Sequence, residues 1–284
     1  MEKSIRIKCP AKINLTLEII NRREDGFHNI KSIMQMINLY DFLTIKVKES
    51  ESSEIILSGN SDEIPYNEKN LVYKACELFF EKNGIKNFKT EIYIEKNIPI
   101  SAGLAGGSTD AAGTLYGLNN IFENILTDSE LEELCAQLGS DLNVCLKGGC
   151  VIATSRGEVT KKIPSINSPV TLIKPKYLGI SAKEAYTKYS EKSVKPQNGY
   201  TEKMLIAILD QDSIQDYLYN DLEYAIFEDY SELQTIKKAY PDSIMSGSGS
   251  TYFVLENLKE SALDENYTFI NNLKFIDSGV SVDG

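Results

Sequence analysis

The chain has 284 residues, 42% of them hydrophobic and 25% charged, and it is long enough to bury a substantial core. Its 30 basic and 41 acidic side chains give a formal charge of −11. This balance argues against general nucleic-acid or anionic-membrane binding, both of which require a basic surface. The sequence contains no apolar run of 18 residues and no signal-peptide pattern, so we expect a cytoplasmic protein.

Five cysteines are scattered along the chain, and no two form a Cys-x-x-Cys pair. This spacing favours buried, reduced thiols over a disulfide framework or a zinc site. They are Cys9, Cys76, Cys135, Cys145 and Cys150.

The first half of the chain mixes strand and helix patterns. A period of two in hydrophobicity predicts strands or short apolar strands at residues 5–20, 30–39, 42–48, 54–57, 90–96 and 150–154. A polar turn is expected at 21–26. Three helices are predicted. The first begins at Asn70, a good N-cap, and the second spans 108–122. The third begins at Thr127, which forms a capping box with Glu130, and ends at about 138.

The second half opens at 163–169, where two prolines and several polar residues suggest a domain boundary. We therefore divide the chain into domains at 1–162 and 163–284. Beyond the boundary the patterns predict a strand at 170–173, helices at 181–189, at 200–209 and twice within 217–240, and a strand-turn-strand at 243–255. Strands and helices are mixed without strict alternation, which favours an α+β fold.

One glycine-rich loop carries most of the functional information. Residues 99–113 read Pro-Ile-Ser-Ala-Gly-Leu-Ala-Gly-Gly-Ser-Thr-Asp-Ala-Ala-Gly and lead into a predicted helix. Glycines allow close approach of the backbone, and free N–H groups at a helix start attract an anion such as phosphate. The loop has neither the Lys of a Walker A motif nor the G-x-G-x-x-G spacing. A tight connection is the alternative interpretation, and close packing against another element or a ligand explains Gly113 inside the helix.

Four other segments are candidates for chemistry. Lys12 starts an apolar strand and is either a solvated cation or one aimed at a reacting phosphate or hydroxyl. Asp141 lies in a Gly-Ser turn, and it is either a turn-forming residue or a carboxylate that orients or deprotonates an alcohol. Residues 245–253 are a second Gly/Ser loop, either a hairpin or a cover over a ligand. His28, the only histidine, follows a Gly turn beside an aromatic ring and is either structural or part of a stacking corner.

Three of these segments together resemble the GHMP kinases, small-molecule kinases named for galactose, homoserine, mevalonate and phosphomevalonate. Residues 10–15, 99–109 and 246–250 match the family's three motifs in order and spacing, so the resemblance spans essentially the whole chain. It implies a two-domain α+β kinase fold, with an N-terminal ATP-binding domain, a C-terminal substrate-side domain and the active site in the cleft between them.

The Asp-Gly-Phe-His segment at 25–28 is similar to one branch of this family, whose substrate carries a cytidine diphosphate group and belongs to non-mevalonate isoprenoid synthesis. The resemblance implies ATP-dependent phosphorylation of the substrate's tertiary 2-hydroxyl. Magnesium is expected on chemical grounds, without assigned protein ligands. The expected partner is a small molecule, with no nucleic acid and no membrane, and the chain is expected to be a monomer or homodimer.

The resemblance also implies a set of site residues. The catalytic pair is Lys12 and Asp141. The ATP contacts are Asn70, Lys96, Pro99, Ser101, Ala102, Gly103, Leu104, Ala105, Gly106, Gly107, Ser108 and Thr109. The substrate contacts are Asn14, Phe27, His28, Tyr186, Gly247, Ser248 and Gly249, with Phe27 and Tyr186 on either side of the cytosine.

Two positions depart from that family branch. Leu142-Asn143-Val144 stands where the branch usually has an apolar residue, Pro and Phe, and Phe27 stands where Tyr is more common. The first difference could alter the loop that aims Asp141, because Pro would fix φ there. Three alternatives remain: a sister kinase acting on mevalonate, phosphomevalonate or homoserine, a nucleotide-binding regulator without catalysis, and an unrelated binding domain with glycine-rich turns.

Overall fold

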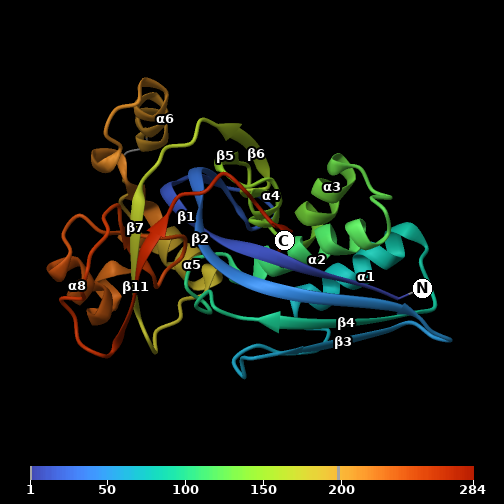
Figure 1. The fold of residues 1–284 in the computed structure, drawn as a ribbon. Coiled ribbons are helices and arrows are strands. Elements are labelled where there is room, and N and C mark those ends of the chain that lie inside the picture. The colour runs from blue at the N-terminus through green and yellow to red at the C-terminus, as the bar shows by residue number, and fades with distance from the viewer. Residues whose placement is uncertain (1, 197–198) are drawn as a thin grey trace.

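The computed structural model describes residues 2–196 and 199–284, which form two β-sheets with helices packed on them (Figure 1). The larger sheet has eight strands in the described residues, and its main path runs β12-β1-β2-β4-β3. β5 pairs with β2, β6 pairs with β5, and β8 pairs with β1. These strands are β1 (Glu2–Arg22), β2 (His28–Glu49), β3 (Glu54–Gly59), β4 (Phe88–Glu95), β5 (Cys150–Thr154), β6 (Val159–Ile163), β8 (Tyr219–Asn220) and β12 (Ser281–Val282).

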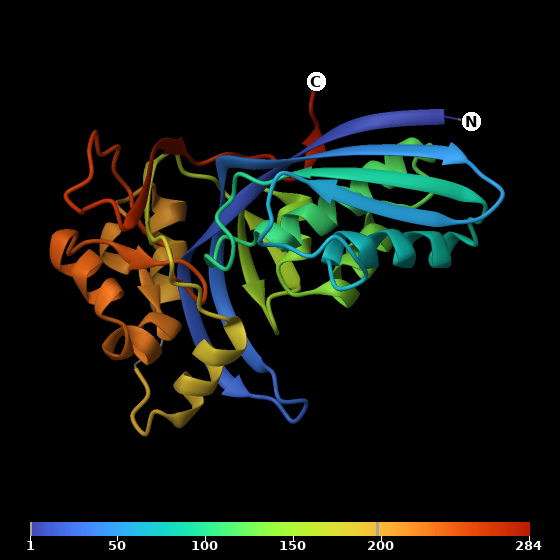
Figure 2. The ribbon, with the colours of Figure 1, turned by 90° about the horizontal axis from the view of Figure 1, so that it is seen from below.

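Four helices of the first half belong to the lobe of the large sheet, and Figure 2 shows helices packed under that sheet. They are α1 (Leu71–Asn83), α2 (Gly106–Ile121), α3 (Asp128–Leu138) and the short α4 (Leu142–Lys147). α2 packs directly on β1: a Cβ atom at Gly113 would lie 2.4 Å from Sγ of Cys9. Close packing of helix on strand therefore explains this glycine, and no ligand is needed for it.

The second sheet forms the core of the other lobe, at the left in Figure 1. Its strand order is β11-β7-β10-β9. The strands are β7 (Pro169–Pro175), β9 (Ile244–Met245), β10 (Tyr252–Val254) and β11 (Tyr267–Lys274). The helices of this half are α5 (Ala182–Glu191), α6 (Tyr200–Asp210), α7 (Asp221–Ile226) and α8 (Ser231–Ala239), with short 3₁₀ turns at Gln215–Tyr217 and Phe227–Asp229.

β1 passes from one core to the other. Ile7 and Cys9 pack with the helical layer, whereas Ala11, Ile13 and Leu15 belong to the second cluster, together with side chains of the smaller sheet. The pairing of β1 with β2 shifts register between Pro10 and Ala11, where this change occurs. Side chains alternate along a strand, so Lys12 and Asn14 point away from the second core.

The α+β prediction is confirmed, and the structure refines several of its elements. The strands expected at 30–39 and 42–48 are one continuous strand, β2. Helix α2 begins at Gly106, so the last two glycines of the loop lie in its first turn. The division at 162/163 stays a prediction, and two strands of the second half, β8 and β12, pair with β1. Among the described residues, no helix is both long and apolar enough to span a membrane.

Candidate active site

Lys12 and Asp141 form an ion pair at the junction of the two lobes. Nζ of Lys12 lies 3.4 Å from Oδ2 of Asp141, and the lysine side chain is only 4% exposed. The same ammonium donates to Oδ1 of Asn14 at 2.7 Å and to the carbonyl of Gly103 at 3.2 Å. A buried cation is thus held in one orientation by three oxygens, and its carboxylate partner remains partly accessible.

The two glycine-rich loops meet beside this pair. The Ser246 hydroxyl donates to the carbonyl of Gly103 at 3.0 Å, and a Cβ atom at Gly103 would lie 2.0 Å from the carbonyl oxygen of Ser246. At Gly247 a Cβ atom would lie 3.3 Å from Nζ of Lys12. Both residues have positive φ, +74° and +54°. Glycine is required at these positions because the backbones approach closely in a conformation that L side chains rarely adopt.

A cavity of about 880 Å³ extends from the ion pair along the tip of the β1–β2 hairpin to α5. Of the site residues predicted from the sequence, those that line this cavity are Lys12, Asn14, Phe27, His28, Gly103, Ala105, Ser108, Asp141, Tyr186, Gly247 and Ser248. The structure therefore brings the candidate catalytic pair, parts of both glycine loops and the predicted aromatic corner to a single cavity. A volume of this size is typical of sites for small organic ligands.

The aromatic corner is built from the hairpin and α5, which lie side by side in Figure 2. The His28 ring stacks on Tyr186, with centroids 5.1 Å apart and planes inclined by 18°, and its Nε2 lies 3.1 Å from the Ser190 hydroxyl. Burial lowers the pKa of His28, with a further contribution from the charge of Arg22, and this shift favours the neutral ring. Phe27 is 53% exposed and forms the open side of this corner.

Comparison with known proteins agrees with this geometry. Residues 70–151 match the family model described as GHMP kinases N terminal domain. A 4-diphosphocytidyl-2-C-methyl-D-erythritol kinase from Clostridioides difficile (strain 630) is 38% identical over 268 residues, which cover 91% of this chain and 89% of that one. The chain belongs to the 4-diphosphocytidyl-2-C-methyl-D-erythritol kinase family. The family resemblance carried by the three motifs is thereby confirmed.

Other relatives of the kinase extend this result. A protein of the same name from Bacillus cereus (strain B4264) is 40% identical over 260 residues, covering 88% of this chain and 87% of that one. A crystal structure of a 4-(cytidine 5'-diphospho)-2C-methyl-D-erythritol kinase has a TM-score of 0.71 at 30% identity over 90% of each chain. A homoserine kinase from Cytophaga hutchinsonii has a TM-score of 0.75 at 19% identity, with 98% and 97% coverage, and shares the fold.

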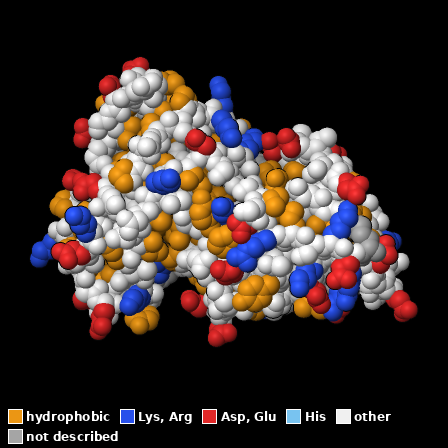
Figure 3. Space-filling view, viewed as in Figure 1, with side chains coloured by type: hydrophobic (Ala, Val, Ile, Leu, Met, Phe, Trp, Pro, Cys, Tyr) orange, Lys and Arg blue, Asp and Glu red, His pale blue; other side chains and the backbone are white. Residues whose placement is uncertain are grey.

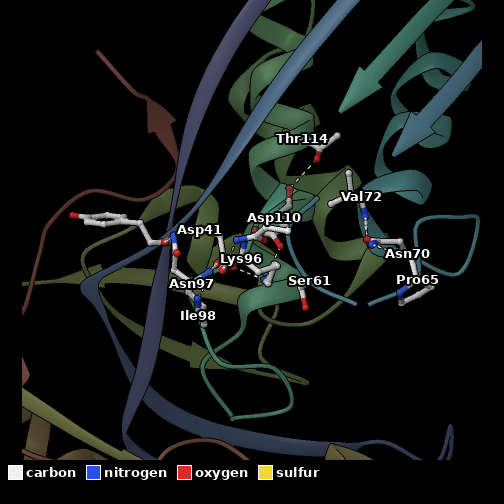
Figure 4. A network of polar contacts seen from close by, with 12 residues as sticks. Asp41, Ser61, Pro65, Asn70, Val72, Lys96, Asn97, Ile98, Asp110 and Thr114 are labelled. Carbon is white, nitrogen blue, oxygen red and sulfur yellow. Dashed lines mark hydrogen bonds and ion pairs between the residues drawn. The ribbon is translucent and has the colours of Figure 1, made fainter. Parts of the chain in front are cut away.

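Lys96, a predicted ATP contact, lies in a buried charge cluster of the kinase (Figure 4). Its ammonium contacts Oδ2 of Asp41 and lies 2.8 Å from Oδ2 of Asp110. Both aspartates are buried: Asp41 is 0% exposed and Asp110 is 2% exposed. Asp41 also accepts from the backbone N–H groups of Asn97 and Ile98 at 2.6 and 2.8 Å. Burial, reinforced by the charge of Asp41, raises the pKa of Asp110 to about 7.

This cluster lies directly beneath the glycine loop. A Cβ atom at Gly106 would be 3.1 Å from Nζ of Lys96. Asn70, the other predicted nucleoside contact, caps α1 with its Oδ1 and donates from Nδ2 to the Pro65 carbonyl at 2.7 Å. Neither Lys96 nor Asn70 lines the cavity described above. Their roles in ATP binding stay predictions.

The remaining predicted loop residues also lie outside the cavity lining. They are Pro99, Ser101, Ala102, Leu104, Gly106, Gly107, Thr109 and Gly249. Ala102 and Leu104 are buried in the second core, so only their backbones could serve a ligand. The Thr109 hydroxyl is buried.

Several lining residues of the kinase were not predicted from the sequence. The apolar ones are Leu17, Ile30, Met34, Ala182 and Leu222, and the polar or charged ones are Arg22, Ser140, Arg156, Lys183, Thr187, Ser190 and Glu191. α5 supplies several of them. The Ser181 cap, which starts this helix, is the one sequence signal that could have indicated that these residues share a helix with Tyr186. Arg156 has no such signal, because it stands alone in a turn.

Proposed function

We propose that the kinase transfers the terminal phosphoryl group of ATP to the 2-hydroxyl of 4-diphosphocytidyl-2-C-methyl-D-erythritol, in the non-mevalonate route to isoprenoids. The single observation that supports this most is the layout of the cavity. The Lys12–Asp141 pair stands at one end, and the corner of Phe27, His28 and Tyr186 stands at the other. A substrate with a reacting alcohol and a flat base at opposite ends fits this order.

The two charged residues have complementary roles in the proposed transfer. Asp141 accepts or orients the proton of the substrate hydroxyl as that oxygen attacks phosphorus. Lys12 offsets the negative charge that develops on the attacking oxygen and on the transferred group. Asn14 and the Gly103 carbonyl hold the ammonium in place, so little reorganisation is needed during the reaction.

The residues of the first glycine loop fit an ATP phosphate chain. Gly106 and Gly107 start α2, whose first N–H groups lack helical partners, and Ser108 reaches the cavity wall. The helix dipole adds positive charge at this end. Magnesium bound to the phosphates would supply further neutralisation, held by phosphate oxygens and water. Within residues 2–196 and 199–284 no group of three His, Cys, Asp or Glu side chains is placed to hold a metal ion.

At the other end, we propose that the aromatic corner receives cytosine. His28 and Tyr186 offer ring faces and edges beside the exposed Phe27 ring. We place the reaction in the cytoplasm, with a small molecule as the partner and a monomer or homodimer as the working state.

The test replaces Asp141 with Asn and measures ADP release from ATP, Mg²⁺ and the cytidine substrate. Asp141 makes no side-chain capping bond to α4, so the change removes charge without removing a helix cap. We expect turnover to fall about 100-fold or more while ATP binding is retained. Asp62→Asn, in an exposed loop, is the matched control and should keep wild-type turnover. An Asp141→Asn variant with most of its rate would rule out the assigned role, and firm ATP binding by the wild type without ADP release would favour a regulator.

A further inference from the structure

The cavity wall has the opposite charge balance to the chain as a whole. The chain carries −11, and acidic and basic side chains are interspersed over the face shown in Figure 3. The cavity is lined by four cations, Lys12, Arg22, Arg156 and Lys183, and by two carboxylates, Asp141 and Glu191. Such local excess of positive charge focuses an anionic ligand into a cleft. With Lys12 and Asp141 paired, most of this excess lies toward the aromatic corner.

Arg156 is the cation at this end that the structure holds most firmly. It sits in a tight turn after β5, where the N–H of Gly157 donates to the Thr154 carbonyl at 3.0 Å. Glu158 accepts from the backbone N–H of Arg156 at 2.8 Å and from its Nε at 3.4 Å. The guanidinium carbon lies 5.3 Å from the centre of the Phe27 ring. This distance is within the range of a cation–π interaction, which favours keeping the guanidinium beside the ring.

The turn is joined to the hairpin tip across a long stretch of sequence. The Ser155 carbonyl accepts from the N–H of Ile30 at 2.7 Å, and Arg23 donates to the Ser155 hydroxyl at 3.2 Å and to Asn29 at 3.1 Å. These bonds hold the turn against the tip of the β1–β2 hairpin, which carries Phe27. Arg156 is thus positioned before any ligand arrives, and a positioned donor loses little entropy on binding.

We propose that Arg156 binds the diphosphate group of the substrate and thereby determines specificity for a nucleoside diphosphate over a nucleoside, an inference that rests on the proposed function. Among the described residues, its side-chain hydrogen bond runs only from Nε, so both terminal amino groups remain for a ligand. A guanidinium fork matches two phosphate oxygens, whereas neutral cytosine gains nothing from the excess of positive charge. The diphosphate links the base to the reacting end and must pass between them.

The chain offers a matched control. Arg6 also places its guanidinium over a phenylalanine ring, 4.6 Å from the centre of Phe42, and pairs with carboxylates at 3.0 Å. It lies outside the cavity lining. Arg6→Gln therefore removes the same chemical contacts as Arg156→Gln without touching the proposed site.

The experiment measures direct binding of CDP, CMP and cytidine to the purified full-length kinase by calorimetry, and the KM values for substrate and ATP. For Arg156→Gln we expect CDP binding and the substrate KM to weaken about tenfold or more, with cytidine binding and the ATP KM within about twofold of wild type. Arg156→Lys should restore part of the CDP affinity, because it keeps the charge but not the fork. Arg6→Gln should leave every value unchanged.

Three outcomes would overturn the proposal. Equal losses for CDP and cytidine would assign Arg156 to the base or to the shape of the hairpin, and unchanged CDP binding would remove it from the site. A raised ATP KM with unchanged CDP binding would place Arg156 at the other phosphate chain and equally refute the assignment. Binding of CDP does not require turnover, so these results stand apart from the test of the reaction itself.

Discussion

Replacing Lys96 with Met should destabilise the kinase strongly, because this lysine is the shared partner of two buried carboxylates. Its ammonium contacts Asp41 and lies 2.8 Å from Asp110, and both acids are almost fully buried. Met is similar in shape to the aliphatic part of Lys, and the change removes the charge together with the hydrogen bonds that the ammonium donates to Asp41 and Asp110. Breaking a buried pair by deleting one partner typically costs about 3–5 kcal/mol, since the remaining charge keeps its desolvation penalty. Against a total stability of about 5–15 kcal/mol, this is a large fraction.

The assay is urea unfolding followed by far-UV circular dichroism. With a slope of about 3 kcal/mol/M, the expected loss moves the midpoint down by about 1–2 M. Lys161→Met, on the exposed side of β6, is the control and should change the free energy of unfolding by less than about 0.5 kcal/mol. Adding Asp110→Asn to Lys96→Met should recover part of the stability, because a neutral amide replaces a buried carboxyl that has lost its cation and lies beside Asp41. A loss below about 1 kcal/mol for Lys96→Met, with an unchanged slope, would refute the view that its ammonium compensates both acids.

The remaining predictions concern the same cluster and the aromatic corner. Because the pKa of Asp110 is raised to about 7 in the folded protein, its contribution to stability is present below about pH 4 and is lost as pH rises to 7, by up to about 4 kcal/mol. Asp110→Asn should lack this slope in urea unfolding across pH, and parallel profiles would contradict the shift. His28→Ala should raise the KM for the cytidine substrate with little change for ATP, since its ring stacks on Tyr186 at the far end of the cavity. An unchanged substrate KM in steady-state assays would exclude His28 from the pocket.

Local sequence signals predicted the elements that local chemistry determines. The Asn70 cap and the Thr127–Glu130 capping box start α1 and α3 where the residue types indicate. β6 was not predicted, because Val159–Ile163 is mostly polar and becomes a strand through its pairing with β5. The break expected near 40 is absent as well: β2 continues there, and the irregularity is taken up by a register shift opposite Pro10 and Ala11.

The same distinction separates the site residues that could be predicted from those that could not. Lys12 and Asp141 lie in short motifs whose residue types suggest their chemistry, and the fold brings them to 3.4 Å. Asp41 and Asp110 flank Lys96 only because β2, β4 and α2 converge, and no local pattern links them. Arg156 is likewise an isolated arginine in the sequence, and its position depends on bonds between a turn and a distant hairpin.

An acidic chain that binds two phosphate-bearing ligands, as we propose for this kinase, must solve the charge problem locally. In this kinase three cations at or beside the site are paired with carboxylates: Lys12 with Asp141, Lys96 with two aspartates, and Arg156 with Glu158. Pairing lowers the net positive charge, so it cannot by itself raise affinity for anions. Its physical effect is to fix where the remaining donors point. Affinity then comes from oriented N–H groups and a few placed cations, which is compatible with a surface of the opposite sign.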